Sequence, residues 1–325
     1  MQSEKGTDIS VVVPLYNEDE SITELCEWIG RVMDLHGFTY EVILVDDGSR
    51  DKSWQVVQAL SQKNPSIKGI QFNRNYGKSA ALNVGFRHCS GRVVITMDAD
   101  LQDSPDEIPE LYDMIINHGH DLVSGWKKKR FDPISKTIPS KFFNYITRKI
   151  SGIHLHDFNC GLKAYRLEVV KSLEVYGEMH RYIPVIAKWN GFSKISEKIV
   201  VHRPRKYGTT KFGLERFING FLDLLSITFV SRFRKKPMHF FGSLGTVSFL
   251  FGLVVTIYLI VRKVVQISNQ LPVRDIVDQP LFFLALVALI VGVQLFLAGF
   301  LAEMMTMNSD KKSDYLIINR LRLKE

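Results

Sequence analysis

The residues best suited to chemistry form the run Asp98-Ala99-Asp100-Leu101-Gln102-Asp103, directly after the β-rich stretch Val93–Met97. Two carboxylates spaced i, i+2 at a strand end can converge, and hard carboxylate oxygens are the ligands that Mg²⁺ and Mn²⁺ prefer. A D-x-D run alone is a weak signal, because surface loops contain one by chance. Its place after a buried strand predicts a divalent-cation site whose other ligands are the diphosphate oxygens of a bound substrate.

Two further polar runs follow apolar stretches that read as strands. Val11–Glu18 leads from strand to loop and contains Tyr16, and Val45–Ser49 contains the pair Asp46 and Asp47. These carboxylates can accept hydrogen bonds from ribose hydroxyls or a base edge, and the aromatic ring offers a stacking face. Turn and helix-cap chemistry is the alternative for both aspartates.

A third run, Asn73–Lys78, also follows a strand and places the Lys78 cation at the same edge. The run is not a P-loop, because the sequence contains no G-x-x-x-x-G-K-[ST].

The elements that must position these residues alternate along the first 125 residues. Short β-branched runs bounded by turn residues predict strands, and apolar residues at helical spacing predict helices between them. Strands separated by single helices predict an α/β fold with a mostly parallel sheet covered on both faces, and ligands at the carboxyl ends of its strands. The predicted strands are Ile9–Pro14, Glu41–Val45, Ile67–Phe72 and Val93–Met97, and the predicted helices are Glu20–Leu35, Ser53–Gln62, Ser79–His88 and Pro105–His118.

Charge and cysteine content narrow the function classes. The formal net charge of +8 suits a phosphorylated substrate or an acidic membrane surface. Nucleic acid is not an expected partner, because basic and aromatic residues do not interleave on a sheet face.

Cys26, Cys89 and Cys160 form no C-x-x-C pair, which argues against a zinc site or a disulfide framework and favours a reducing compartment. The first residues lack a signal-peptide pattern, so we expect the α/β domain in the cytosol.

Two apolar runs, Met238–Val261 and Leu281–Ala302, contain no Asp, Glu, Lys or Arg. Each can cross a hydrocarbon core of about 30 Å. Lys and Arg are frequent on the outer flanks of the two runs, whereas the predicted loop between them contains only Arg262, Lys263 and Arg274. The positive-inside rule therefore predicts a multi-pass protein of the cytoplasmic (inner) membrane with both outer flanks in the cytosol.

Before the first span, Gly213–Arg234 carries apolar residues at helical spacing and ends in the basic run Arg232–Lys236. This pattern indicates an interfacial helix, with a core helix of the α/β domain as the alternative. The predicted segments are an α/β domain at 1–212, a juxtamembrane amphipathic helix at 213–236, a transmembrane hairpin at 237–305 and a basic cytosolic tail at 306–325.

Four motifs in series, V-V-V-P-L-Y-N-E, V-D-D-G-S, N-Y-G-K-S-A-A-L and D-A-D-L-Q-D-S-P, resemble the family 2 glycosyltransferases of the GT-A fold. The resemblance covers about residues 8–235 and is closest to the branch of dolichyl-phosphate mannose synthases and bacterial undecaprenyl-phosphate glycosyltransferases with two spans. It implies a Rossmann-like domain that transfers a hexose-type sugar, with inversion, from a nucleotide-sugar donor to polyprenyl phosphate. The bacterial resemblance favours UDP over GDP.

The resemblance also implies roles for individual residues. Asp157 opens the segment Asp157–Lys163, which is similar to the family D-x-x-S-G-F-[RK] but departs from it at Cys160 and Leu162. Gly177–Pro184 is similar to the acceptor-side segment. The matching positions are Asp98, Asp100 and Gln102 for Mg²⁺ or Mn²⁺, Pro14, Tyr16, Glu18, Asp46 and Asp47 for the nucleotide, Asp157 for the sugar and acceptor, and Arg205 and Lys211 in an R-x-x-G-x-[ST]-K element.

A lipid phosphate is already an anion, so the expected mechanism needs positioning and charge stabilisation rather than a strong base. Asp100, Asp157, Arg205 and Lys211 are the expected catalytic residues, and His180 is expected to orient the acceptor loop. Arg203, Lys127–Arg130 and Lys141 are further phosphate-binding candidates, with lipid-headgroup contact an equal alternative for the run Lys127–Arg130.

Three other readings compete with this one. A processive polysaccharide synthase would carry Q-x-x-R-W and more spans, and a glycan or lipid-glycan acceptor also stays open. A non-catalytic nucleotide-binding scaffold would show degenerate metal ligands, whereas Asp98, Asp100 and Gln102 are intact. Glycines in the spans could let helices approach closely, and we expect a homo-oligomer.

Overall fold

The computed structural model describes residues 6–128, 144–204, 206–207, 237–272, 274–307 and 317–322. The chain forms two compact units: Met1–Ile227 together with Asp314–Glu325, and Thr228–Ser313. Several predicted features lie outside the described residues: the amphipathic helix at 213–236, the cations Lys141, Arg205 and Lys211, and the last two residues of the run Lys127–Arg130.

The first unit is built on one eight-stranded sheet with the order β7-β5-β6-β4-β1-β2-β3-β8. The neighbouring pairs β1–β2, β1–β4, β2–β3 and β5–β7 are parallel, whereas β6 and β8 run antiparallel to their neighbours. The strands are β1 Ile9–Leu15, β2 Tyr40–Asp46, β3 Ile67–Phe72, β4 Val93–Thr96, β5 Leu122–Trp126, β6 Lys163–Arg166, β7 Ile195–Ile199 and β8 Ile317–Leu321.

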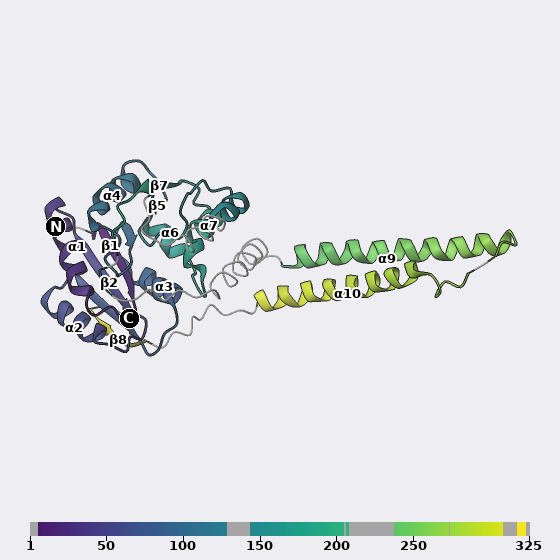
Figure 1. The fold of residues 1–325 in the computed structure, drawn as a ribbon, viewed down its shortest axis with the longest axis horizontal. Helices are drawn as coiled ribbons and strands as arrows, with labels where there is room; N and C mark the ends of the chain where they lie inside the picture. Colours follow the sequence, from purple (N-terminus) through teal and green to yellow (C-terminus); the bar gives the residue numbers. More distant parts are fainter. Residues whose placement is uncertain are drawn as a thin grey trace. The chain divides into compact units, whose positions relative to one another are not determined.

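Helices cover both faces of this sheet (Figure 1). Successive side chains of a strand point to opposite faces, so Val11 and Val13 of β1 pack in one apolar cluster and Val12 packs in the other. Burial on both faces explains the nearly continuous apolar runs of the central strands. The helices on the Val11 face are α1 Ile22–His36, α2 Ser53–Lys63 and α4 Ile108–Ile116, with the short helix η1 Pro105–Glu107 just before α4. The helices on the Val12 face are α3 Lys78–His88, α6 Leu167–Ser172, η2 Met179–Tyr182 and α7 Ile183–Trp189. Residues 144–151 are also helical.

The four predicted strands and four predicted helices of the first 125 residues are confirmed, with end positions that shift by a few residues. The structure adds β5, β6 and β7, which the sequence analysis did not predict. The β6 strand has only four residues, begins at Lys163 and ends at Arg166, so its sequence lacks the apolar run that identifies a buried strand.

The strand β8 lies in the segment that the sequence analysis assigns to a basic tail. It pairs antiparallel with β3 and forms the last strand of the sheet at that edge. Its sequence, IINRL, follows the hairpin and contains two polar residues among three apolar ones. A strand this short gives little periodic signal, which is why only the tertiary pairing identifies it.

The second unit is a pair of long apolar helices, α9 Pro237–Ser268 and α10 Pro280–Met307, each long enough to cross a membrane. Most of their apolar side chains are exposed, as expected for side chains that face lipid. Arg262 and Lys263, which the sequence analysis assigns to the connecting loop, lie within α9. The helix continues past the apolar run because its backbone hydrogen bonds do not depend on side-chain polarity.

Glycines let α9 and α10 approach closely. A Cβ on Gly245 would lie 2.7 Å from the Gly292 carbonyl oxygen, and a Cβ on Gly252 would lie 2.8 Å from the Ala285 carbonyl oxygen. The Ser248 hydroxyl donates to the Ala288 carbonyl across the same seam at 2.9 Å. These glycines therefore serve packing within one chain.

At the amino ends of the strands, away from the polar loops, Glu41 is a buried carboxylate with several donors. Its oxygens accept hydrogen bonds from the Ser10 hydroxyl at 2.5 Å, the Ser90 amide at 2.7 Å and the Lys68 ammonium at 2.5 Å. Burial acts to raise the pKa of Glu41, but the hydrogen bonds from Lys68, Ser10 and Ser90 outweigh it and lower the pKa.

We predict that Glu41→Gln lowers the free energy of unfolding at pH 7 by about 2–4 kcal/mol, because a charged acceptor with several donors is lost. A carboxyl pKa that is lower in the folded state stabilises the protein above the unfolded-state pKa, and this stabilisation is lost as pH falls. The difference between variant and wild type should therefore shrink as pH falls below about 4. Urea unfolding followed by tryptophan fluorescence at several pH values measures it. The exposed Glu27→Gln is the control, and an equal loss at pH 7 and pH 3 would contradict the assignment.

Candidate active site

Hydrogen bonds join the three loops at the carboxyl ends of β1, β2 and β3, the first two through Asn17 and the last two through Asp47. The Asn17 amide donates to the Ser49 hydroxyl at 2.9 Å, and the Arg50 amide donates to the Asn17 side-chain oxygen at 2.8 Å. Asn17 itself has a φ of 57°, a left-handed conformation that Asn tolerates better than most residues. This junction holds Tyr16 and Glu18, two predicted nucleotide-contacting residues, half-buried in the loop after β1.

Asp46 and Asp47 are buried at the end of β2 and accept hydrogen bonds from neighbouring loops. Asp46 accepts from the Ser49 amide at 2.9 Å, and Asp47 accepts from the Tyr76 amide at 2.7 Å and the Gly77 amide at 2.9 Å, just before α3 begins. Turn and cap chemistry, the alternative that the sequence left open, is therefore present. A carboxylate has about four acceptor positions, so nucleotide contact stays a prediction for both residues.

The electrostatics of these two aspartates differ from those of a solvated carboxylate. Burial raises the pKa of Asp47 to about 6, although the amide hydrogen bonds from Tyr76 and Gly77 oppose that shift and the adjacent Asp46 adds to it. Burial likewise raises the pKa of Asp46. A nucleotide hydroxyl or N–H that donates to either carboxylate would lower its pKa and recover part of the cost of burying the charge.

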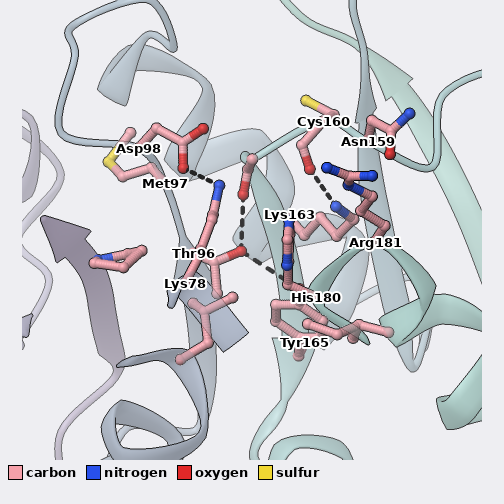
Figure 2. Close-up of a pocket in the computed structure, with 14 residues that line it drawn as sticks. Lys78, Thr96, Met97, Asp98, Asn159, Cys160, Lys163, Tyr165, His180 and Arg181 are labelled. Carbon is pink, nitrogen blue, oxygen red and sulfur yellow. Dashed lines mark hydrogen bonds and ion pairs between the residues drawn. The ribbon is translucent and has the colours of Figure 1, made fainter. Parts of the chain in front are cut away.

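A pocket lies beside this junction, where β1, β4, β6 and η2 meet (Figure 2). Three predicted site residues line it: Pro14, Lys78 and Asp98. The lining also includes Lys163 from β6 and the pair His180 and Arg181 from η2. The pocket therefore brings together segments that lie more than 160 residues apart in the sequence.

Asp98 is the acidic group of the pocket lining, and it forms an ion pair with the Lys78 ammonium. Burial acts to raise its pKa, but the charge and hydrogen bond of Lys78 prevail and lower the pKa of Asp98 to about 2. The Gly161 backbone passes so close that a Cβ there would lie 2.6 Å from an Asp98 carboxylate oxygen. The Thr96 hydroxyl donates to the Gly161 carbonyl at 2.9 Å and fixes this approach.

The loop after Asp98 contains the other two predicted metal ligands. The Gln102 amide donates to an Asp100 carboxylate oxygen at 3.2 Å, and between them Leu101 has a φ of 60°, an uncommon conformation for a non-glycine residue. The Arg203 amide donates to the Gln102 carbonyl at 2.9 Å, which attaches the segment after β7 to this loop.

Hard oxygen donors in this loop fit Mg²⁺ or Mn²⁺, and Asp98 already holds a cation, the Lys78 ammonium. Within the described residues, no group of three or more His, Cys, Asp or Glu side chains could hold a metal by itself. The arrangement thus suits a metal that takes part of its ligands from a bound substrate.

Lys163 and Arg181 are the cations that the sequence analysis did not single out as site residues. Lys163 is buried, and among the described residues no carboxylate forms an ion pair with it; its ammonium donates to the Cys160 carbonyl. Burial lowers its pKa. Arg181 forms an ion pair with Glu178 at 3.3 Å. Both residues belong to motifs quoted above, but a motif does not reveal which of its side chains lines the pocket together with Asp98.

His180 contacts the start of α3 and has a lowered pKa. Burial, together with the nearby cations Lys78 and Arg181, lowers the pKa of His180 well below its usual value. Its Nδ1 lies 3.1 Å from the Ser79 hydroxyl, and its backbone amide donates to the same hydroxyl at 3.0 Å. These contacts attach η2 to the start of α3, and the orienting role of His180 stays a prediction.

The remaining expected site residues are placed less directly. Asp157 is buried two positions before the pocket-lining Asn159, whose amide donates to the Asp157 carboxylate at 3.0 Å. Lys127, the first residue of the basic run, forms a buried ion pair with Asp103 at 2.8 Å, and phosphate binding by this residue stays a prediction. Arg203 lies over the Trp28 ring at 4.3 Å.

Comparison with known proteins gives concordant results. Glycosyl transferase family 2 matches residues 10–174. A dodecaprenyl-phosphate galacturonate synthase from Rhizobium johnstonii is 35% identical over 321 residues, which cover 96% of this chain and 93% of that protein. An undecaprenyl-phosphate 4-deoxy-4-formamido-L-arabinose transferase from Shewanella sediminis is 37% identical over 247 residues, 75% of this chain and 73% of the relative.

Among solved structures, glucosyl-3-phosphoglycerate synthase from Mycobacterium tuberculosis in complex with Mn²⁺, UDP and glucosyl-3-phosphoglycerate has a TM-score of 0.53. The match is 20% identical in sequence and covers 70% of this chain and 80% of that one. The likeness is one of fold, and it confirms the predicted GT-A architecture.

We predict that Gly48→Ala disrupts the junction of the three loops. Gly48 has a φ of 71°, and a Cβ there would lie 2.4 Å from the backbone carbonyl carbon of Arg74. The combined strain and clash should cost about 3 kcal/mol or more of unfolding free energy. Gly37→Ala is a matched control, because Gly37 has a φ of 66° but nothing within 4 Å of its Cβ position. The control should lose about 1 kcal/mol. Equal losses in urea unfolding would show that the loop contact is unimportant.

Proposed function

The chain belongs to glycosyl transferase family 2, and from this membership we propose that it transfers a sugar from a nucleotide-sugar donor to a polyprenyl phosphate. The protein is a glycosyltransferase, and the relatives named above are polyprenyl-phosphate sugar synthases or transferases. The specific reaction that we propose uses a divalent metal, a UDP-sugar of the hexose type and undecaprenyl phosphate, and it inverts the anomeric centre.

The observation that best supports this proposal is the composition of the pocket. Asp98, just after β4, lines the same pocket as Lys163 and Arg181, and this lining contains more basic than acidic side chains. Buried cations without enough protein carboxylates are stabilised by an anionic ligand. In the proposed reaction the pocket would have to hold two anions close to Asp98: the diphosphate of the nucleotide-sugar and the acceptor phosphate.

On the donor side, the nucleoside would lie over the junction formed by Asp46, Asp47 and Tyr16, with Pro14 and Glu18 at its border. Asp98, Asp100 and Gln102 would hold Mg²⁺ or Mn²⁺, which when bound neutralises the diphosphate leaving group. The low pKa of Asp98 keeps this carboxylate ionised over the working pH range. UDP is supported by the solved neighbour, whose complex contains UDP and Mn²⁺.

On the acceptor side, a phosphate oxygen needs no proton removal before it attacks the anomeric carbon. The residues of the pocket then have to bind and orient the acceptor and shield it from water. We assign Lys163 and Arg181 to the acceptor phosphate, because they line the pocket opposite Asp98 and supply positive charge. Asp157, Arg205 and Lys211 stay candidates for the same step. Attack from the face opposite the leaving diphosphate inverts the sugar.

The two relatives carry different sugars in their names, galacturonate and 4-deoxy-4-formamido-L-arabinose. A screen of purified protein with UDP-glucose, UDP-galacturonate and GDP-mannose, each with undecaprenyl phosphate, would identify the donor. The hairpin of α9 and α10 supports a membrane location for the acceptor, and the basic flanks support a cytosolic active site.

We predict that Asp100→Ala reduces sugar transfer by at least about 10³-fold, because the metal loses a ligand at the leaving group. Membrane insertion should be unchanged. Incorporation of radiolabelled sugar into the lipid fraction measures the transfer, and EDTA should abolish it in wild type until Mn²⁺ is restored. Asp113→Ala, at a half-exposed position of α4, is the control. Full turnover by Asp100→Ala, or indifference to EDTA, contradicts the metal assignment.

We predict that Lys163→Met lowers kcat/KM for undecaprenyl phosphate by about 10²–10³-fold while UDP affinity changes little. Methionine is apolar and similar in size, so the buried position should still pack and the melting temperature should not fall. The exposed Lys194→Met controls for a general loss of positive charge. Should Lys163→Met instead raise the Kd for UDP and leave the acceptor KM unchanged, Lys163 serves the donor.

A further inference from the structure

The strand that follows the hairpin, β8, completes a row of polar side chains that ends at Asp46. Asp46 of β2 is the register partner of Gln71 of β3, and Gln71 is the register partner of Asn319 of β8. Side chains directly opposite each other on neighbouring strands point to the same face and can interact. One row across three strands therefore links the sheet edge to the predicted nucleotide-contacting carboxylate.

The hydrogen bonds along this row have a direction. The Asn319 side-chain amide donates to the Gln71 Oε1 at 3.0 Å, and the Gln71 Nε2 donates to Asp46 Oδ2 at 3.4 Å. A primary amide accepts at its oxygen and donates at its nitrogen, so the two ends of the Gln71 side chain are not equivalent. Because Asn319 donates to the oxygen, the nitrogen is turned toward Asp46.

The contacts around β8 hold Asn319 in place. The Leu321 side chain packs where Trp54 approaches Gly69, and the Arg322 Nε donates to the Ser61 carbonyl at 2.9 Å. The ladder also contains a register shift between Gln71 and Phe72, after which Phe72 pairs with Ile317. Strand β8 is thus fixed on both sides of the row.

We propose that β8 is a positioning element of the donor site, in which Asn319 acts through Gln71 to orient the Asp46 carboxylate. Asp46 receives the Ser49 amide at Oδ1 and Gln71 at Oδ2, and a carboxylate has about four acceptor positions. In this proposal the remaining positions accept from the nucleoside part of the donor. The ligand recognised there is a group with O–H or N–H donors, such as ribose or a pyrimidine. Asn319 does not touch the nucleotide. The inference rests on the proposed function.

The variant Asn319→Asp tests this relay, because the introduced side chain has nearly the same shape but no amide donor. Gln71 would then turn its nitrogen toward the new carboxylate and present its oxygen to Asp46, where two acceptors repel each other. We expect the Kd for UDP in the presence of Mn²⁺ to rise about tenfold, since a hydrogen bond to a charged group is lost. Asn319→Ala should raise it by a smaller factor, because Gln71 then stays free to donate to Asp46.

The experiment is isothermal titration calorimetry on the full chain in detergent, together with steady-state kinetics using the donor that the screen identifies. The KM for the donor should rise in Asn319→Asp, while kcat, the KM for undecaprenyl phosphate and the melting temperature stay as in wild type. Arg320→Gln is the matched control, because residue 320 is adjacent on the strand and its side chain points to the opposite face.

The outcomes separate the inference from the proposed function. Equal affinity of wild type and Asn319→Asp for UDP with Mn²⁺ overturns the relay and leaves the glycosyltransferase assignment intact. A fall in melting temperature with equal loss for donor and acceptor, or the same loss in Arg320→Gln, also overturns it, because β8 would then be a structural edge only. If the wild-type protein binds no nucleoside diphosphate, both the relay and the proposed function are overturned.

Discussion

Burial of the sheet on both faces is the constraint on which the rest of the first unit depends. Helices from both sides cover the apolar rows of β1, β2 and β4, so polar side chains gather where these strands end. Asp46, Asp47 and Asp98 all stand at that edge, each one residue or two beyond a buried apolar run. Hydrogen bonds then join the loops after β1, β2 and β3 into one surface beside Asp46 and Asp47.

Charge balance shapes the pocket beside that surface. A carboxylate next to several cations stays ionised, and the pKa of Asp98 is correspondingly low. Lys163 is the opposite case, because burial favours its neutral form and its ammonium is bonded to a backbone carbonyl. Burying such a cation costs free energy when no anionic ligand is bound. Because Lys163 lines the same pocket as Asp98, we attribute this cost to the binding of an anionic substrate.

The hairpin and the sheet illustrate two ways of bringing backbones together. In the second unit, α9 and α10 pack closely because the glycines at their contact have no side chain, namely Gly245, Gly252 and Gly292. Between helices in a membrane this packing does not depend on a hydrophobic driving force. In the first unit, β8 supplies backbone hydrogen bonds to the open edge of β3. Covering that edge also protects it from pairing with another chain. The chain thus uses residues on both sides of its hairpin to build one sheet.

The sequence by itself determined the α/β class, the strands and helices of the first 125 residues, the two long apolar helices and the aspartates at the strand ends. These features depend on local periodicity and on the residue types that turns require, which a single sequence records. Tertiary structure alone decided that Lys163 and Arg181 line the same pocket as Asp98, that Lys127 is paired with Asp103, and that residues after the hairpin form β8. Each of those facts depends on contacts between segments far apart in the chain or on which side chain the fold buries. Short strands such as β6 and β8 are stabilised by their neighbours in the sheet, so their own residues carry little sign of them.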